Sequence, residues 1–410
     1  MIPRLSEGAR CVVGALFPVV LGLLLTVAAS STNAVTDDAA ARTDRFTVTS
    51  KALAETREIL VRRPPGFDPD QRYPVVYTTD GEWNFELVAA YLDYLADNSV
   101  YPPVIVSGVV NVNRNRDYVP RPDKYFEDTG RADAFLDFVE RDWMPAIAGY
   151  YPVAEQSVLV GHSFGGVFVL HSLFSGRDLF DAYIALGSSA WIADRVLFDE
   201  AEAWFKDNPA ADDFVYMAVG EGDGGPTVPS SKALADLFEE QAPASLEWAF
   251  DVTPRTDHFK NVMSGMHDGF MALFPAWGFP DELALAAEDG AAGVDRWFAA
   301  TEKSLGWRFY PAWFDLGVLA QRLAREGNVD AARAITRHLR EYHPADAFVA
   351  QFSAAVYASS EDWEAAASEY RRAIALAESQ SLHPNSMHIA PLQRGLARAE
   401  ARLKQTTSGG

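Results

Sequence analysis

The sequence predicts a largely parallel α/β sheet covered by helices, followed by an all-α region. Between about residues 45 and 280, short apolar runs alternate with helical stretches, as expected for strands that helices cover on both faces. Residues 307–404 show no strand pattern, only amphipathic helical periodicity. A chain of 410 residues is also too long for a single hydrophobic core, so at least two folded units are expected.

Residues 1–34 have the features of a secretory signal peptide. Arg4 and Arg10 precede an apolar run over residues 12–29. A small-x-small site ends at Ala34, after which cleavage is expected. An uncleaved membrane anchor is the alternative, because the apolar run is close to the shortest that spans a bilayer. With cleavage, the exported chain has no membrane span and is periplasmic or secreted. It would hold no disulfide, because the only cysteine, Cys11, precedes the cleavage site.

Charge and residue spacing argue against two kinds of ligand. The 35 Lys and Arg residues are outnumbered by 57 Asp and Glu, which gives a formal net charge of −22. Nucleic-acid binding is therefore not expected, since its affinity comes mainly from clustered Lys and Arg. The chain has no helical His-x-x-x-His pair and no cysteine pair, so no metal ion is expected.

Within the α/β part, seven apolar runs bounded by Gly, Pro or Asp are typical of buried strands. These runs fall at residues 59–62, 75–78, 104–110, 157–160, 182–186, 214–219 and 246–251. Four of the stretches between them predict helices. These helices are expected at residues 85–96, 133–150, 165–175 and 230–241.

The C-terminal part differs in composition and in period. Residues 281–306 are rich in Ala, Glu and Gly and predict a linker or a loose helix. Within residues 307–404, the window 327–332 aligns with the window 361–366 at a period of 34 residues, which is typical of tetratricopeptide repeats. Such repeats bury their faces against one another and offer a surface for a protein or peptide partner. An unrelated helical bundle is the alternative.

The stretch 157–166 carries the strongest chemical signal. Its Gly-x-Ser-x-Gly motif around Ser163 follows an apolar run and precedes a helical stretch, which is the context of the nucleophile elbow in an α/β-hydrolase fold. The tight turn needs glycine on both sides and holds the serine in a strained conformation. It lifts the hydroxyl above the sheet edge and makes the Phe164 N–H an oxyanion donor. Alternatively, the serine only caps the helix.

A catalytic triad in this fold runs Ser, then acid, then His along the chain. The acid should follow the second strand beyond the elbow, where Asp223 is the first choice and Glu221 the reserve, although either could be a solvated loop carboxylate. His258 follows the last predicted strand by a short loop and is preferred as the base over His267. The imidazole would take the proton of Ser163 while the carboxylate fixes its tautomer.

Two histidines near the elbow are expected to have packing or structural roles. His162 precedes the serine, with its side chain directed away from the nucleophile, and His171 falls in the following helix. The four remaining histidines belong to the helical tail and are not expected at the site.

The α/β part resembles the esterase family of α/β-hydrolases that includes enterochelin (siderophore) esterases, S-formylglutathione hydrolase and the mycolyltransferases. The siderophore-esterase branch is the most similar. The resemblance extends over about residues 45–275 and does not include the helical tail. The matching segments, in chain order, are residues 73–82, 113–117, 134–140, 161–166, 179–184 and 188–191.

The resemblance implies further site residues. The second oxyanion N–H would come from Glu82, and the acyl or alcohol pocket would be lined by Asn113, Arg114, Arg116 and Trp191. It also supports His258 as the base. Relatives place a small Gly-Ser pair after that histidine, whereas this chain has Phe259 and then a lysine, so the substrate is not carried over.

The expected function is therefore that of an exported serine esterase. It would hydrolyse small or medium carboxylic esters through an acyl-enzyme and would need no cofactor. Two alternatives stay open: acyl transfer to an alcohol instead of water, and a non-catalytic protein whose helical repeats bind a partner.

Overall fold

The computed structural model describes residues 38–98, 100–274, 281–305, 312–379 and 389–408. The expected signal peptide, its cleavage site and Cys11 lie outside these residues. In the described part of the chain, no helix combines the length and the apolar character that crossing a membrane requires.

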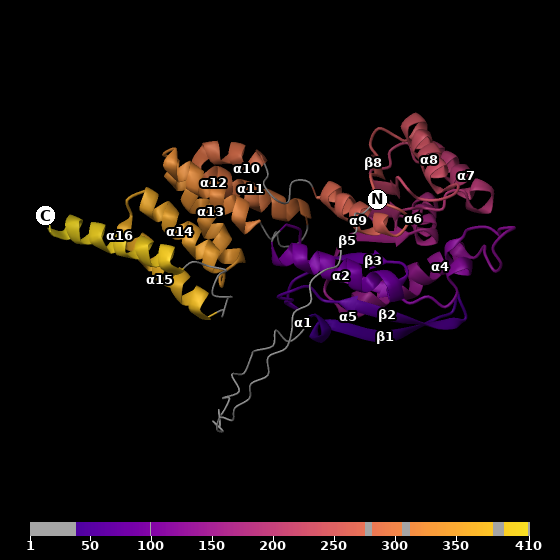
Figure 1. The fold of residues 1–410 in the computed structure, drawn as a ribbon, viewed down its shortest axis with the longest axis horizontal. Coiled ribbons are helices and arrows are strands. Elements are labelled where there is room, and N and C mark those ends of the chain that lie inside the picture. The colour runs from indigo at the N-terminus through magenta and orange to yellow at the C-terminus, as the bar shows by residue number, and fades with distance from the viewer. Residues whose placement is uncertain (1–37, 99, 275–280, 306–311, 380–388, 409–410) are drawn as a thin grey trace, which may run out of the picture. The chain divides into compact units, whose positions relative to one another are not determined.

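One eight-stranded sheet organises the α/β part, in the order β1-β2-β4-β3-β5-β6-β7-β8 (Figure 1). The strands are β1 (Thr43–Ser50), β2 (Glu55–Arg62), β3 (Tyr73–Thr78), β4 (Ile105–Val109), β5 (Val153–His162), β6 (Ala182–Leu186), β7 (Phe214–Gly220) and β8 (Glu247–Thr253). From β4 to β8 every neighbouring pair is parallel, whereas β2 runs antiparallel to both β1 and β4. The predicted fold class is confirmed.

All seven predicted strands are present, but the prediction missed β1. This strand lies at the edge of the sheet and pairs with β2 as an antiparallel hairpin. Its side chains alternate between exposed and half-buried, and its first residues are polar, so it lacks the apolar run of a central strand. An edge strand covered on one side gives a weaker pattern than a buried one.

Helices cover both faces of the sheet. On one face, α2 and α9 pack against residues such as Val76 and Val160, and on the other α3 to α8 pack against residues such as Tyr77 and Leu159. Successive strand residues alternate between the two cores, as the two-residue period of a strand requires. The helices are α1 (Asp38–Ala41), α2 (Gly81–Asp97), α3 (Arg114–Tyr118), α4 (Ala132–Phe138), α5 (Met144–Tyr150), α6 (Phe164–Phe174), α7 (Ile192–Asp207), α8 (Thr227–Gln241) and α9 (Lys260–Leu273).

The single helix expected over residues 133–150 is divided. A π-helical turn, η1 (Val139–Trp143), separates α4 from α5. Pro145 lies in the first turn of α5 and has no N–H to donate to the preceding turn, which explains why the regular α-helical hydrogen bonds stop there.

The C-terminal part is helical, as predicted. It contains α10 (Asp281–Ala286), η2 (Ala287–Asp289), α11 (Gly290–Leu305), α12 (Trp313–Arg325), α13 (Val329–Tyr342), α14 (Ala347–Ser359), α15 (Trp363–Ser379) and α16 (Ile389–Ser408). The segment expected as a linker or loose helix thus forms α10, η2 and α11, and it buries Leu283, Val294 and Phe298 in the helical core.

The two windows with the 34-residue period form equivalent helix starts. The Asn328 side chain accepts a hydrogen bond from the Ala331 N–H at the start of α13, at 3.4 Å. The Asp362 side chain accepts one from the Ala365 N–H at the start of α15, at 3.3 Å. The positions correspond at the predicted period, while the assignment to tetratricopeptide repeats stays a prediction.

Candidate active site

Ser163 lies in a sharp turn between β5 and α6, with φ of 61° and ψ of −117°. A positive φ is unfavourable for a residue with a side chain and costs on the order of 1–3 kcal/mol. The neighbouring glycines make the turn possible: a Cβ on Gly161 would lie 2.3 Å from the carbonyl oxygen of Gly165, and a Cβ on Gly165 would lie 2.3 Å from Thr79 Oγ1. The Ser163 N–H donates to the Leu186 carbonyl at 2.9 Å, which fixes the turn to β6.

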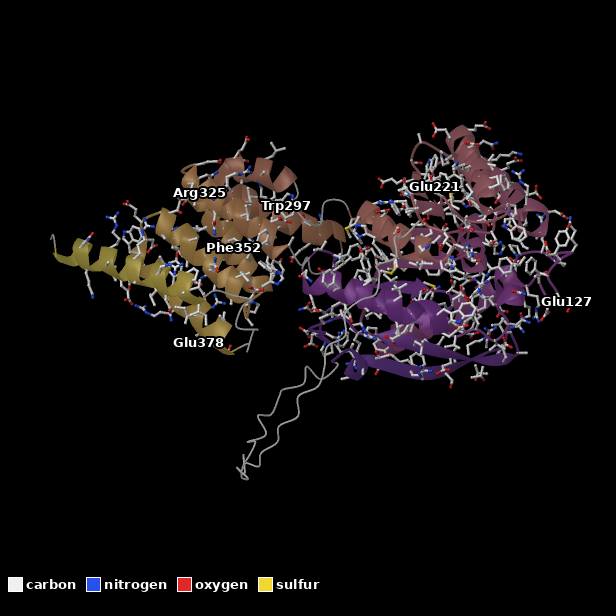
Figure 2. The ribbon with its side chains drawn as sticks, viewed as in Figure 1. Glu127, Glu221, Trp297, Arg325, Phe352 and Glu378 are labelled. Atoms are coloured by element: carbon white, nitrogen blue, oxygen red, sulfur yellow. The ribbon has the colours of Figure 1, made fainter. Side chains whose placement is uncertain are left out.

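Asp223 and His258 lie together at the same edge of the sheet. His258 Nδ1 lies 2.8 Å from Asp223 Oδ2, and the side chains are 28% and 3% exposed. A nearly buried carboxylate fixes the imidazole because few other partners reach it. Glu221, by contrast, is exposed and accepts a hydrogen bond from the Arg255 N–H at 3.1 Å (Figure 2). His267 lies within α9, where its Nδ1 contacts the Tyr91 hydroxyl.

His162 connects the elbow to His258. Its Nε2 lies 2.8 Å from the His258 carbonyl oxygen, and the two ring centroids are 4.4 Å apart. A carbonyl oxygen only accepts, so His162 Nε2 carries the proton. Burial, and then the charge of His258, lowers the pKa of His162 to about 3. A packing or structural role was predicted for His162, but its contact with the loop that carries His258 was not.

The structure brings His258 to Ser163 through His162. The ring of His258 lies against that of the residue that precedes Ser163 in the chain. No hydrogen bond between Ser163 Oγ and His258 Nε2 is formed among the described residues. In unliganded sites this contact is often long and tightens only when substrate binds.

Two N–H groups point out of helix starts beside the serine. Phe164 is the first residue of α6 and Glu82 is the second residue of α2, so neither N–H has a partner within its own helix. The two helix starts lie close together: a Cβ added to Gly165 in α6 would lie 3.0 Å from Oδ2 of Asp80, which precedes α2. This arrangement suits a developing negative charge.

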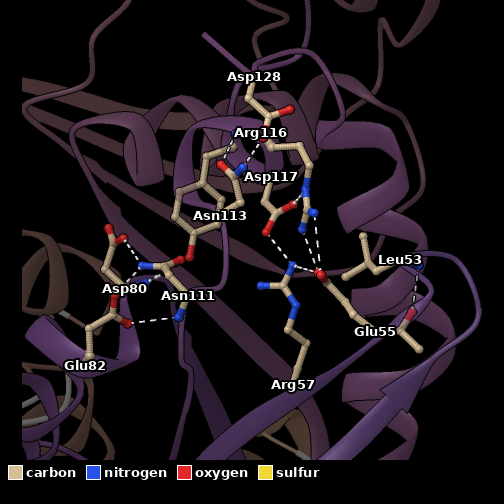
Figure 3. A network of polar contacts seen from close by, with 12 residues as sticks. Leu53, Glu55, Arg57, Asp80, Glu82, Asn111, Asn113, Arg116, Asp117 and Asp128 are labelled. Atoms are coloured by element: carbon tan, nitrogen blue, oxygen red, sulfur yellow. Dashed lines mark hydrogen bonds and ion pairs between the residues drawn. The ribbon is translucent and has the colours of Figure 1, made fainter. Parts of the chain in front are cut away.

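Asp80 and Arg114 hold the start of α2 against the elbow. Asp80 is buried with φ of 56°, and its carboxylate accepts from Arg114 Nε at 2.6 Å and Nη2 at 3.1 Å. Arg114 Nη2 also donates to the His162 carbonyl at 2.9 Å. Burial raises the pKa of Asp80, and Arg114 acts in the opposite direction. The Asn111 side chain joins Asp80 to the Glu82 carboxylate, at 2.7 and 2.8 Å (Figure 3).

Two of the four expected pocket residues, Asn113 and Arg116, are held by polar contacts with other residues of the chain. The Asn113 side chain accepts from the Arg116 N–H at 3.1 Å and donates to Asp128. Arg116 donates to Asp117 at 2.7 Å and to Glu55 at 2.6 Å (Figure 3). These contacts shape the loop after β4, and a contact of either residue with substrate stays a prediction.

The other two expected pocket residues, Arg114 and Trp191, lie beside the elbow. The guanidinium carbon of Arg114 is 5.4 Å from the centre of the Phe164 ring. The Trp191 ring is 6.0 Å from that of Phe126, which packs edge-on against Phe164 at 5.2 Å. Trp191 Nε1 donates to Thr227 Oγ1 at 3.3 Å, which fixes the indole at the start of α8.

Three aromatic side chains also lie around the site, and of these only Phe259 was singled out from the sequence. Trp83 lies 5.6 Å from the Arg114 guanidinium, Phe126 packs on Phe164, and the Phe259 ring lies 5.4 Å from that of His258. Trp83 directly follows Glu82, a predicted site residue, which is the one signal that would have indicated it. Within the described residues, no group of three or more His, Cys, Asp or Glu side chains is arranged to hold a metal ion.

The chain is similar to known siderophore esterases. It is 37% identical over 86 residues to the siderophore triacetylfusarinine C esterase of Aspergillus fumigatus, covering 20% of this chain and 30% of that protein. It is 27% identical over 159 residues to the ferri-bacillibactin esterase BesA of Bacillus subtilis, covering 34% of this chain and 55% of that protein. The matched segments thus span between 30% and 55% of the length of these two relatives.

One solved structure has the same fold as this chain over nearly its whole length. The IroE-like serine hydrolase of Shewanella oneidensis superposes with a TM-score of 0.61 at 27% identity, covering 73% of this chain and 99% of that one. This likeness confirms an α/β-hydrolase fold. The model of the family described as "Putative esterase" matches residues 50–272, which is more than half of the 410 residues. The chain therefore belongs to this esterase family.

Proposed function

We propose that the chain is a serine esterase that hydrolyses carboxylic esters through Ser163, His258 and Asp223. In the first step, His258 Nε2 takes the proton of the Ser163 hydroxyl while Oγ bonds to the ester carbonyl carbon. The carbonyl oxygen becomes an oxyanion, which accepts hydrogen bonds from the N–H groups of Phe164 and Glu82. Asp223 stabilises the imidazolium through its bond to Nδ1.

Collapse of this intermediate breaks the bond between the carbonyl carbon and the alcohol oxygen. The leaving alcohol takes the proton from His258, and Ser163 stays acylated. Water then gives a proton to His258 and attacks the acyl carbon, and the acid leaves as the Ser163 hydroxyl is restored. No step needs a cofactor.

The observation that carries the proposal is the 2.8 Å contact between His258 Nδ1 and Asp223 Oδ2. With Nδ1 bound to Asp223, Nε2 is the nitrogen of His258 that can accept a proton. The His258 ring packs against His162, which precedes Ser163. The named activities of two similar proteins, a siderophore triacetylfusarinine C esterase and a ferri-bacillibactin esterase, support small-molecule esters as substrates. Export to the periplasm or beyond the cell is part of the same proposal.

Turnover of p-nitrophenyl butyrate tests the proposal. We expect Ser163→Ala to lose about 10³-fold or more of kcat/KM and to lose labelling by a fluorophosphonate. Ser175→Ala is a matched control, because Ser175 follows α6 and bonds the Ser172 carbonyl. A loss of less than about tenfold in Ser163→Ala would contradict the serine mechanism.

Two alternatives are separated by further measurements. Transfer of the acyl group to an alcohol would yield a new ester when an acceptor alcohol is present, whereas hydrolysis yields only the acid. A protein or peptide partner of the helical part stays a prediction, which binding assays on the full chain would address.

A further inference from the structure

Exposed apolar side chains gather at the edge of the sheet where Ser163 lies. Four of the large apolar residues exposed in the α/β part come from loops or helix starts that follow a strand at this edge. These four are Trp83, Val112, Phe259 and Met263. Single exposed apolar residues are ordinary, but several around one site mark a surface that binds apolar groups.

Two of these rings flank the proposed catalytic residues. Phe259 is 78% exposed, and its ring centroid lies 5.4 Å from that of His258 and 6.1 Å from that of His162. Trp83 is 66% exposed and lies 5.6 Å from the Arg114 guanidinium, which itself contacts Phe164. Phe259 thus contacts the residue that precedes Ser163, and Trp83 is linked through Arg114 to the residue that follows it.

The cations beside these rings are already paired. Asp80 binds Arg114 through both carboxylate oxygens, at 2.6 and 3.1 Å. Lys260, which follows Phe259, is bound by Asp257. An anionic substrate would have to compete with these carboxylates and would meet the Glu82 carboxylate, whereas an uncharged apolar group can bind the exposed rings without such competition.

We infer that Trp83 and Phe259 form an aromatic rim that binds the apolar part of an uncharged ester. The inference rests on the proposed esterase function and specifies its substrate class. The substrates are neutral aryl or alkyl esters, and the rim contributes to their binding by removing apolar surface from water.

The test compares esters on the full-length protein. We measure kcat/KM for p-nitrophenyl acetate and p-nitrophenyl hexanoate in the wild type, Phe259→Ala, Trp83→Ala and Tyr94→Ala. The ratio of the two values is insensitive to partial misfolding, because both esters report on the same active fraction. Tyr94 is the matched control, since it lies on α2 like Trp83 and is 65% exposed, but near the other end of that helix.

Each buried methylene contributes about fourfold in affinity, so a wild-type ratio of at least about tenfold in favour of hexanoate is expected. Phe259→Ala and Trp83→Ala should each lower it by about threefold or more, and Tyr94→Ala should leave it unchanged. The singly charged p-nitrophenyl hydrogen glutarate should react at least about tenfold more slowly than p-nitrophenyl valerate.

Equal ratios in the wild type and both rim variants would overturn the rim, as would faster turnover of the charged ester. If no ester is turned over in a manner that depends on Ser163, the proposed function itself fails, and the rim inference fails with it. Ser163-dependent turnover with equal ratios would refute the rim alone, so the two failures can be told apart.

Discussion

The two edges of the central sheet differ in what their polar groups contact. At the amino edge, a cavity of about 1070 Å³ lies among the first residues of β3 and β5 and the segments that precede β6 and β7. Its lining includes Asp178, Asp181 and Asp213, and no histidine is among the described residues that line it. At the carboxyl edge, Asp223 is bound to His258, whose ring packs beside the elbow of Ser163.

An acidic hollow alone is therefore not sufficient for a hydrolytic site. Acyl transfer needs a nucleophile, a base and oxyanion donors at a common point. At the amino edge, the one serine in the cavity lining, Ser157, has its hydroxyl near the Leu179 carbonyl and the Asp181 carboxylate, at 3.3 and 3.5 Å. Substitutions at the carboxyl edge should therefore affect catalysis, and a substitution at the amino edge should affect stability alone.

Loss of the proposed base should have the largest effect. His258→Gln removes the group that takes the Ser163 proton, so kcat should fall by about 10³-fold or more while the fold is retained. His267→Gln is the control, because His267 lies in α9, contacts Tyr91 of α2 and has no role in the proposed mechanism. Steady-state kinetics on p-nitrophenyl butyrate gives kcat for both variants. Equal losses in the two variants would contradict the assignment.

Loss of the proposed acid should have a large effect on kcat. Asp223→Asn keeps the shape of the side chain but removes the charge that stabilises the imidazolium, so a fall of about 10²–10⁴-fold is expected. Glu221→Gln should change kcat by less than about twofold, because Glu221 is exposed and only accepts from the Arg255 N–H. A larger loss of kcat in Glu221→Gln than in Asp223→Asn would assign the role of the acid to Glu221 instead.

His162 should act as a positioning residue with a moderate effect. His162→Leu removes the donor to the His258 carbonyl, and we expect kcat to fall about tenfold with little change in KM. His162→Gln should restore most of the loss, because its amide can donate to the same carbonyl and the native ring donates as a neutral group. A purely packing role would predict that Leu is tolerated better than Gln.

The sequence predicts the elbow better than the contacts around it. The Gly-x-Ser-x-Gly motif and the run that enters it are local features, and the turn at Ser163 follows them closely. The choice between Glu221 and Asp223 depends on a distant loop: the N–H of Gly222, between them, donates to the Thr256 carbonyl at 2.8 Å. His162 bonds a carbonyl 96 residues away, and no local pattern reports such a contact.

The smallest expected effect concerns stability at the amino edge. Burial, and then repulsion from carboxylates such as Asp178, raises the pKa of Asp213 to about 6, above the value near 4 of an unfolded chain. The stability that protonated Asp213 contributes is fully present below about pH 4 and is lost as the pH rises through about 6. At pH 8 the charged carboxylate therefore destabilises the fold.

Asp213→Asn should accordingly raise the free energy of unfolding at pH 8 by about 1 kcal/mol, a value discounted because Asp213 is only half-buried and partly screened by solvent. Urea unfolding should show the gain at pH 8 and none near pH 4, while esterase activity stays within about twofold. Glu239→Gln, at an exposed position on α8, should show neither change. A gain of the same size at both pH values would exclude titration of Asp213 as its cause, and a large loss of activity would mean that the two edges are not independent.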